Sequence, residues 1–201
     1  MLKLKIDLNI ASVQKDNVHG THKKEGVVLH ETVSSNYKGL DDVRSVSQYL
    51  DNKDYGIHGI TDADGNIAWS LGLGQSIFYH TLSQGNKGSG NVNTRFIGIE
   101  QVSRVMLDYK TRAARIKAWL HMDKEINATA KLVAAAARAH NFPIQDSDGS
   151  RPGVTTHWEV TMRYGVSGGH VDCWPVNHGG YFPKALIIKL AKRYYKAGYH
   201  F

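Results

Sequence analysis

The sequence predicts a single α/β domain with a mixed central β-sheet flanked by helices. Residues 26–30 and 96–100 are short apolar runs typical of buried strands, and residues 111–140 have the residue spacing of a helix. A turn signal at residues 62–66 separates two further apolar runs and indicates a hairpin. At 201 residues the chain is long enough to bury one core without disulfides.

The first 25 residues are polar and carry few periodic cues, so we expect them to wrap the surface of the domain. The first buried strand follows at residues 26–30 and delivers His30 to a polar edge. The same arrangement recurs at residues 153–157, where a short run ends at His157. Both histidines are therefore expected at strand ends, where a core element presents them for chemistry.

A helix and a hairpin are predicted next. Residues 41–50 begin with acidic residues, which suit a helix N-terminus, and their apolar positions repeat at helical spacing. Three side chains share the apolar side of this helix: Val43, Val46 and Leu50. Residues 57–60 and 67–71 then flank residues 62–66, whose Asp-Gly step is a strong hairpin signal.

Residues 85–93 are rich in glycine and asparagine, so we expect a mobile loop there. The buried strand at residues 96–100 follows this loop and ends at Glu100. Glu100 therefore repeats the strand-end placement of His30.

Two helices are predicted in the C-terminal half. The first spans about residues 111–140, packs on the sheet and ends at residues 141–143, which contain a proline. Its apolar stripe consists of Ile126, Ala130, Val133 and Ala137. The second begins at residues 182–183. Its inward side chains are Leu186, Leu190 and Tyr194, and the basic ones that mostly face outward are Lys184, Lys189, Lys192, Arg193 and Lys196.

The net charge of +7 and the pI of about 9.4 favour a polyanionic partner, which could be nucleic acid, an anionic membrane or an anionic cell wall. The basic residues are scattered, and no zinc-finger, basic-zipper or aromatic RNA-binding signature occurs, which argues against nucleic acid. Cys173 is the only cysteine, so no internal disulfide can form.

The N-terminal residues 1–7 interleave charged and apolar side chains, unlike a signal peptide, and no apolar stretch is long enough to cross a bilayer. We therefore expect a protein made in the cytoplasm without a signal peptide. Nothing in the sequence suggests an obligate dimer, so a monomer is expected.

Several residues of the types that bind metals stand at strand ends or in adjoining loops. Catalytic zinc typically takes three protein ligands and leaves the fourth position for water, whose pKa falls to about 7. His30, His157 and either Asp172 or Cys173 could supply such a set, with Glu100 beside them. Any one of the 11 histidines alone would more often be an ordinary hydrogen-bonded residue. Their coincidence with Glu100 favours a zinc site.

A set of short motifs occurs in one order along the chain. They are Val27-Val28-Leu29-His30, Tyr55-Gly56-Ile57-His58 before Asp62-Ala63-Asp64-Gly65, Tyr79-His80, Phe96-Ile97-Gly98-Ile99-Glu100, Asn141-Phe142-Pro143 and Thr156-His157. In this order the chain resembles the type 2 N-acetylmuramoyl-L-alanine amidases, which include phage endolysins and peptidoglycan recognition proteins. The resemblance covers about residues 26–183, and the ordered set is specific although each motif alone is weak. It implies one catalytic domain over residues 1–201, with a basic C-terminal helix at 183–201.

The resemblance implies a reaction and roles for three residues. The reaction is hydrolysis of the amide that joins the muramic acid lactyl group to the first L-alanine of the peptidoglycan stem peptide. His30 and His157 match the two histidine ligands of zinc. Glu100 matches the acidic residue that acts as base or orients the attacking water; the alternative is that Glu100 supports a zinc histidine through a hydrogen bond.

The third ligand is left open because the sequence departs from the family pattern there. Relatives have a shorter segment after the second histidine and continue with Cys-Pro-Gly or Asp-Pro-Gly, whereas this chain has Asp172-Cys173-Trp174-Pro175. Alignment without a gap to the aspartate branch makes Asp172 the ligand and places His170 where relatives carry a basic residue that stabilises the oxyanion. Alignment to the cysteine branch makes Cys173 the ligand, and thiolate suits zinc well. We favour Asp172 slightly.

Two more histidines match family positions that line or support the cleft. His80 is predicted to contact substrate, whereas for His58 a buried, hydrogen-bonded role is at least as plausible. Some relatives carry a tyrosine where Ile57 stands, so no tyrosine-assisted step is expected here.

The resemblance favours a phage endolysin that acts on the cell wall, with a shallow zinc groove along one edge of the domain. The basic face of residues 184–196 could hold the enzyme on anionic cell-wall polymers, or it could be an ordinary solvated helix face. The rival functions are a cytoplasmic amidase that recycles muropeptides and a peptidoglycan-binding protein without activity.

Overall fold

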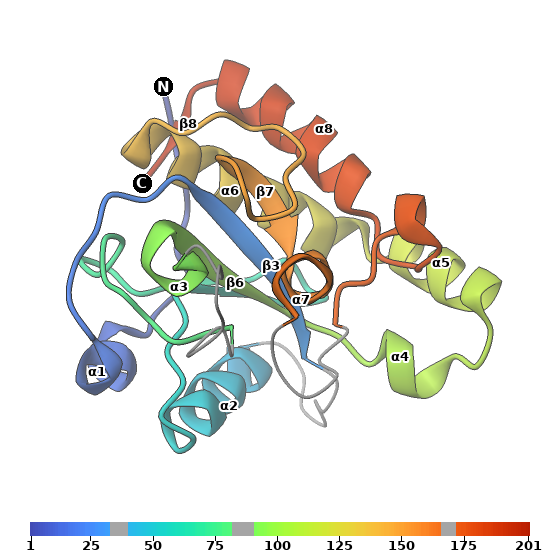
Figure 1. Ribbon diagram of the computed structural model, residues 1–201, viewed down its shortest axis with the longest axis horizontal. Helices are drawn as coiled ribbons and strands as arrows, with labels where there is room; N and C mark the ends of the chain where they lie inside the picture. The colour runs from blue at the N-terminus through green and yellow to red at the C-terminus, as the bar shows by residue number, and fades with distance from the viewer. Residues whose placement is uncertain (33–39, 82–90, 166–171) are drawn as a thin grey trace.

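A six-stranded β-sheet runs through the centre of the computed structural model, in the order β2-β5-β4-β6-β3-β7 (Figure 1). Its strands are β2 (Leu8–Asn9), β3 (Gly26–Thr32), β4 (Gly59–Thr61), β5 (Ile67–Trp69), β6 (Phe96–Val102) and β7 (Gly153–Thr156). Neighbouring strands run parallel except in the β4–β5 hairpin. The predicted mixed sheet and its hairpin are confirmed. The structure describes residues 1–32, 40–81, 91–165 and 172–201.

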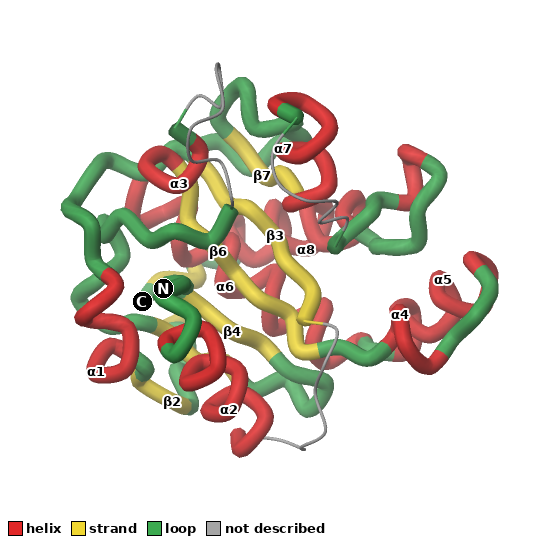
Figure 2. Tube along the Cα trace, turned by 60° about the horizontal axis from the view of Figure 1, so that its bottom comes forward, coloured by secondary structure: helices red, strands yellow, loops and turns green. Residues whose placement is uncertain are grey.

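Helices flank this sheet, as predicted, and Figure 2 shows them in red around the yellow strands. In the described ranges they are α1 (Ala11–Gln14), α2 (Leu40–Asp51), α3 (Val92–Arg95), α4 (Val105–Asp108), α5 (Arg112–His121), α6 (Asp123–His140), α7 (His157–Tyr164) and α8 (Lys184–Lys196), with the 3-10 turns η1 (Lys15–Asn17) and η2 (Val176–His178). A separate two-stranded ladder, β1 (Leu2–Lys3) with β8 (Tyr199–His200), brings the chain ends together (Figure 1). No helix in the described part is both long and apolar enough to span a membrane.

The core lies on both faces of the sheet because successive side chains of a strand point to opposite sides. Val27 and Leu29 of β3 join the main cluster, together with residues of α6 and α8. Val28, between them, packs instead against Val160 of α7 in a smaller cluster. Helix α2 covers a third cluster through Val43. Strand β3 is therefore buried from both sides, which explains its uninterrupted apolar run.

The first 25 residues were predicted to wrap the surface of the domain, and this prediction is only partly right because some of them join the sheet and the core. Leu8 and Asn9 form strand β2, which pairs in parallel with β5 at the sheet edge. The next residue, Ile10, is buried, and so is Lys24 just before β3. A strand of two residues carries no readable period, which is why the sequence did not indicate it.

The predicted helix at residues 111–140 is two helices. The chain leaves helical geometry at Met122, where φ is −90° and ψ is 48°, so α5 ends and α6 begins there. The predicted end is correct, since Asn141 adopts the left-handed conformation that commonly closes a helix. The stripe predicted for this helix is buried throughout α6.

Part of the predicted loop at residues 85–93 lies outside the described residues, which resume at Asn91. Val92 and Asn93 are not in a loop, because they form the first turn of α3 and are both buried. The strand that follows is β6, as predicted.

Helix α8 starts directly after Pro183, as predicted. The three residues predicted to face inward, Leu186, Leu190 and Tyr194, are half-buried and pack against the core. The buried apolar residues of the helix are Ile187, Ile188 and Ala191. The prediction fails at Lys184, whose side chain is 1% exposed rather than on the basic face. The remaining basic residues of that face are exposed: Lys189, Lys192, Arg193 and Lys196.

Candidate metal centre and active site

The candidate site forms where the central parallel strands end. In the register of β3 with β6, His30 lies opposite Glu100. On its other side β3 pairs with β7, where Leu29 lies opposite Thr156. Because parallel strands end at the same edge of a sheet, His30, Glu100 and His157 come together there. His30 and Glu100 lie near the ends of β3 and β6, although each strand continues for two residues beyond the predicted end. His157 is the first residue of α7, directly after β7.

A capping box fixes the start of α7 and hence the position of His157. The backbone N–H of Thr156 donates to Glu159 Oε2 at 2.9 Å, and the Glu159 N–H donates to Thr156 Oγ1 at 3.3 Å. Glu159 in turn binds the buried ammonium of Lys184, with Nζ to Oε2 at 2.6 Å. A buried ion pair and a helix cap therefore hold the segment that presents His157.

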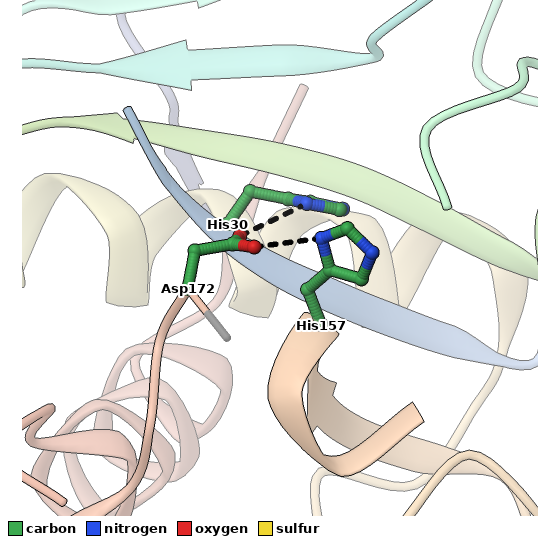
Figure 3. A group of neighbouring side chains, drawn as sticks. All are labelled: His30, His157 and Asp172. Atoms are coloured by element: carbon green, nitrogen blue, oxygen red, sulfur yellow. Dashed lines mark ion pairs between the residues drawn. The ribbon is translucent and has the colours of Figure 1, made fainter. Parts of the chain in front are cut away.

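Asp172 completes a cluster with the two histidines, although it follows them far along the chain (Figure 3). Its Oδ1 lies 2.8 Å from His157 Nδ1, and its Oδ2 lies 3.4 Å from His30 Nδ1. The three potential ligand atoms are all within 4.8 Å of one another. The backbone also joins the two segments, because the Trp158 N–H donates to the Asp172 carbonyl at 3.1 Å. The donor set is two imidazole nitrogens and one carboxylate oxygen, which fits zinc.

The carboxyl group of Asp172 is ionised in this setting. Burial opposes its ionisation, but its contacts with His157, and then with His30, outweigh that effect and hold the pKa of Asp172 well below its usual range. An ionised carboxylate is the form in which aspartate binds a divalent cation.

Cys173, the alternative third ligand, does not join this cluster within the described residues. Its side chain is fully buried among apolar residues of the main core, and burial raises the pKa of the thiol well above its ordinary value. Its φ of 58° is a left-handed conformation, which is uncommon for any residue other than glycine. The structure thus places Asp172 in the cluster and Cys173 in the core.

Glu100 is 9% exposed and stands beside His30 across the strand pair. Burial raises the pKa of Glu100 well above its ordinary value, and the nearby carboxylates of Asp172 and Glu31 add to the effect. Its Oε2 accepts no hydrogen bond from the described part of the chain. A buried carboxylate of raised pKa next to a potential metal site has the properties of a general acid and base.

His80 is bonded to a member of the cluster. Its Nδ1 lies 3.1 Å from His30 Nε2, and its Nε2 lies 3.3 Å from the Phe96 carbonyl oxygen. Burial lowers the pKa of His80 well below its usual value, with further contributions from His30 and His58. Both ring nitrogens therefore have partners within the fold. The predicted contact of His80 with substrate stays a prediction.

His58 and His170 were the other two histidines of interest. His58 is fully buried, accepts a hydrogen bond from the Gly98 N–H and lies 2.9 Å from the Ser76 carbonyl oxygen. That geometry matches the buried, hydrogen-bonded role considered for it. His170 lies outside the described residues.

Sequence reasoning missed two groups of residues around the site. Glu31 accepts hydrogen bonds from the hydroxyls of Ser103 and Tyr181, and burial raises its pKa to about 7 against the effect of both bonds. No local sequence pattern indicates this hydrogen-bond network. For the pair of Lys184 and Glu159, the sequence offered a signal for one member only. Thr156 and Glu159 have the spacing of a capping box, which could have indicated the role of Glu159.

Comparison with known proteins decides the family. The Amidase_2 family, described as N-acetylmuramoyl-L-alanine amidase, matches residues 20–174. The chain belongs to this amidase family. The resemblance stated from the ordered motifs is therefore confirmed, and the chain is an N-acetylmuramoyl-L-alanine amidase that acts on peptidoglycan.

Solved structures similar to this amidase share its fold. The hydrolase AmiA of Staphylococcus aureus, in complex with its ligand, is 19% identical, with a TM-score of 0.59 over 98% of this chain and 96% of its own. The PlyG catalytic domain is 16% identical, with a TM-score of 0.60 over 97% and 96%. The amidase LysC of Clostridium intestinale is 15% identical, with a TM-score of 0.52 over 92% and 93%. Among curated protein sequences, none matches significantly.

Proposed function

We propose that this amidase is a zinc enzyme that cleaves the amide between N-acetylmuramic acid and L-alanine in peptidoglycan. The observation that carries the proposal is the cluster of His30, His157 and Asp172, whose donor atoms lie within 4.8 Å of one another. Catalytic zinc sites commonly hold three protein ligands of these types and leave one position for water. Imidazole nitrogen favours zinc over magnesium or calcium, which prefer oxygen donors.

A zinc ion held by these three residues would supply a Lewis acid for the scissile carbonyl and for the attacking water. The protein contributes the ionised carboxylate of Asp172 and the fixed positions of the two histidines. His30 is fixed by a central strand, and His157 by the capped start of α7. Such preorganisation lowers the entropy lost when the reacting groups meet.

We assign proton transfer to Glu100. As base it would take a proton from the attacking water while the water oxygen bonds to the carbonyl carbon. When the C–N bond breaks, the same carboxyl group would return the proton to the departing amine of L-alanine. The raised pKa of Glu100 suits both halves of this exchange, because a carboxyl group with an ordinary pKa is a poor acid donor to an amine at neutral pH.

We further propose that His170 stabilises the negative charge that develops on the carbonyl oxygen. This assignment is supported by the alignment of His170 with a basic residue of the family, two positions before Asp172. The His170→Ala variant is expected to bind zinc normally and to lose amidase turnover. Loss of zinc in that variant would contradict the assignment.

The biological role we propose is that of an endolysin that acts on intact cell wall. The exposed basic residues of α8 support this role, because the helix itself contains no acidic residue. Lys189, Lys192, Arg193 and Lys196 would attract anionic wall polymers, an interaction that salt weakens. We expect the protein to act as a monomer.

The deciding experiment measures bound zinc and lysis on one preparation. We expect about one zinc per chain, clearing of a suspension of purified walls, and new N-terminal alanine in the released peptides. Removal of zinc with a chelator should abolish clearing, and added zinc should restore it. Absence of zinc together with absence of alanine release, even with zinc supplied, would favour a peptidoglycan-binding protein. Cleavage of soluble muropeptides without clearing of walls would favour the recycling amidase.

A further inference from the structure

His80 is hydrogen-bonded both to His30 of the candidate metal centre and to the backbone. A neutral imidazole has one N–H donor and one lone-pair acceptor, so fixing one nitrogen of a ring fixes the other. When two neutral imidazole rings are hydrogen-bonded to each other, a partner at one end of the pair determines which ring nitrogens donate and which accept.

The end of this chain is the backbone carbonyl of Phe96, which can only accept. Neutral His80 Nε2, 3.3 Å from that oxygen, therefore carries the hydrogen. The opposite nitrogen, Nδ1, then has the lone pair and accepts. It lies 3.1 Å from His30 Nε2, which must donate the hydrogen between the two rings. A neutral His30 that donates through Nε2 has no hydrogen on Nδ1.

That nitrogen is the one turned toward the cluster. His30 Nδ1 lies 3.4 Å from Asp172 Oδ2, and His157 Nδ1 lies 2.8 Å from Asp172 Oδ1. The ring of His30 thus presents Nδ1 to the cluster and Nε2 to His80.

The fold holds His80 in place for this role. Its ring lies against Gly98 of β6, where an added Cβ would come within 2.7 Å of His80 Cγ. The His80 backbone N–H donates to Asn93 Oδ1 at 3.1 Å, and the Thr81 N–H donates to the same oxygen at 2.8 Å. The ring and its backbone are therefore both anchored, one on β6 and the other on α3.

We propose that His80, anchored on the Phe96 carbonyl, is a positioning residue that fixes His30 in the tautomer whose Nδ1 lone pair faces Asp172 and His157. As regards zinc, this inference rests on the proposed function. A histidine ligand whose second nitrogen is held by a hydrogen bond loses about 10–100-fold in metal affinity when that partner is removed.

The test compares His80→Leu with His80→Asn, two side chains of nearly equal shape. Asparagine can place an acceptor oxygen where Nδ1 was, whereas leucine cannot. Zinc dissociation constants are measured by competition with a chelator, and the tautomer of His30 is read from ¹⁵N chemical shifts in the zinc-free protein. We expect a 10–100-fold weaker zinc affinity for His80→Leu and substantial recovery for His80→Asn.

The tautomer measurement needs neither zinc nor a variant, so it stands if His80→Leu fails to fold or if the protein proves not to be a zinc enzyme. Hydrogen on Nε2 of His30 in the wild type supports the inference. Hydrogen on Nδ1 would overturn it, as would an unchanged zinc affinity in folded His80→Leu. Failure of the wild type to bind zinc would instead count against the proposed function.

Discussion

Replacement of Lys184 by methionine should destabilise the protein far more than an ordinary surface change would. The ammonium of Lys184 is buried and donates to Glu159 Oε1 at 2.7 Å, to Glu159 Oε2 at 2.6 Å and to the Ser147 carbonyl at 2.9 Å. A fourth contact, to Asp146 at 2.6 Å, involves a carboxylate that is 57% exposed and therefore adds little. The loss of stability is therefore expected to come mainly from Glu159, whose buried charge loses the Lys184 ammonium.

The magnitude follows from the burial of Glu159, which is 4% exposed. Removing one member of a buried ion pair leaves the other charge without its partner and costs about 3–5 kcal/mol. The double variant Lys184→Met with Glu159→Gln removes both charges and keeps an oxygen for the Thr156 N–H. We expect that variant to lose only about 1–2 kcal/mol, a range typical of weakened neutral hydrogen bonds. With Glu159→Gln alone as the remaining variant, a double-mutant cycle isolates the coupling between the two charges.

Urea denaturation at neutral pH, followed by circular dichroism, gives the free energy of unfolding for each variant. The matched control is Lys189→Met on the exposed face of the same helix, which should stay within about 0.5 kcal/mol of the wild type. If Lys184→Met behaves like this control, the buried pair does not hold α7 as described. Because Glu159 caps the turn that presents His157, Lys184→Met should also weaken zinc binding.

Three further outcomes are expected. Asp172→Ala should lose both bound zinc and wall lysis, whereas Cys173→Ala should keep both; the reverse result would make the cysteine the third ligand. Glu100→Gln should keep zinc while amidase turnover falls at least about 100-fold, and loss of zinc in that variant would instead show that Glu100 supports a ligand. Burial, and then Asp62, raise the pKa of Glu125 well above its ordinary value, so the folded state holds this proton more tightly than the unfolded state and stability falls as pH rises above about 4.5. Glu125→Gln should therefore raise the urea midpoint at pH 8 by more than at pH 4, and an equal change at both would refute the assignment.

Much of the fold could be predicted from the sequence because the signals are local. The apolar runs that became β3 and β6 are buried on both sides, so every position in them is restricted to apolar or small residues. The Asp-Gly turn of the β4–β5 hairpin and the Asn-Phe-Pro end of α6 depend on backbone preferences of a few adjacent residues. The same locality explains why His30 and Glu100 were expected near strand ends, since each lies among the last three residues of its strand.

The sequence did not predict the break at Met122 or the short strand β2, because neither changes the spacing of apolar residues over enough positions to be recognised. Met122 interrupts a pattern that continues in phase from α5 into α6. Leu8 and Asn9 pair with β5 across the sheet edge, a partnership about sixty residues away that no local pattern carries.

The sequence by itself determined the class of fold, the family and two of the three potential metal ligands. Only the tertiary structure placed Asp172 in the cluster and Cys173 in the core, because adjacent side chains leave the backbone in different directions. The tertiary structure also shows that Lys184 lies in a buried ion pair rather than on the surface, and that His80 is hydrogen-bonded to His30. In each case the deciding contact joins residues distant in the chain, and the free energy of such contacts depends on burial and orientation, which only packing establishes.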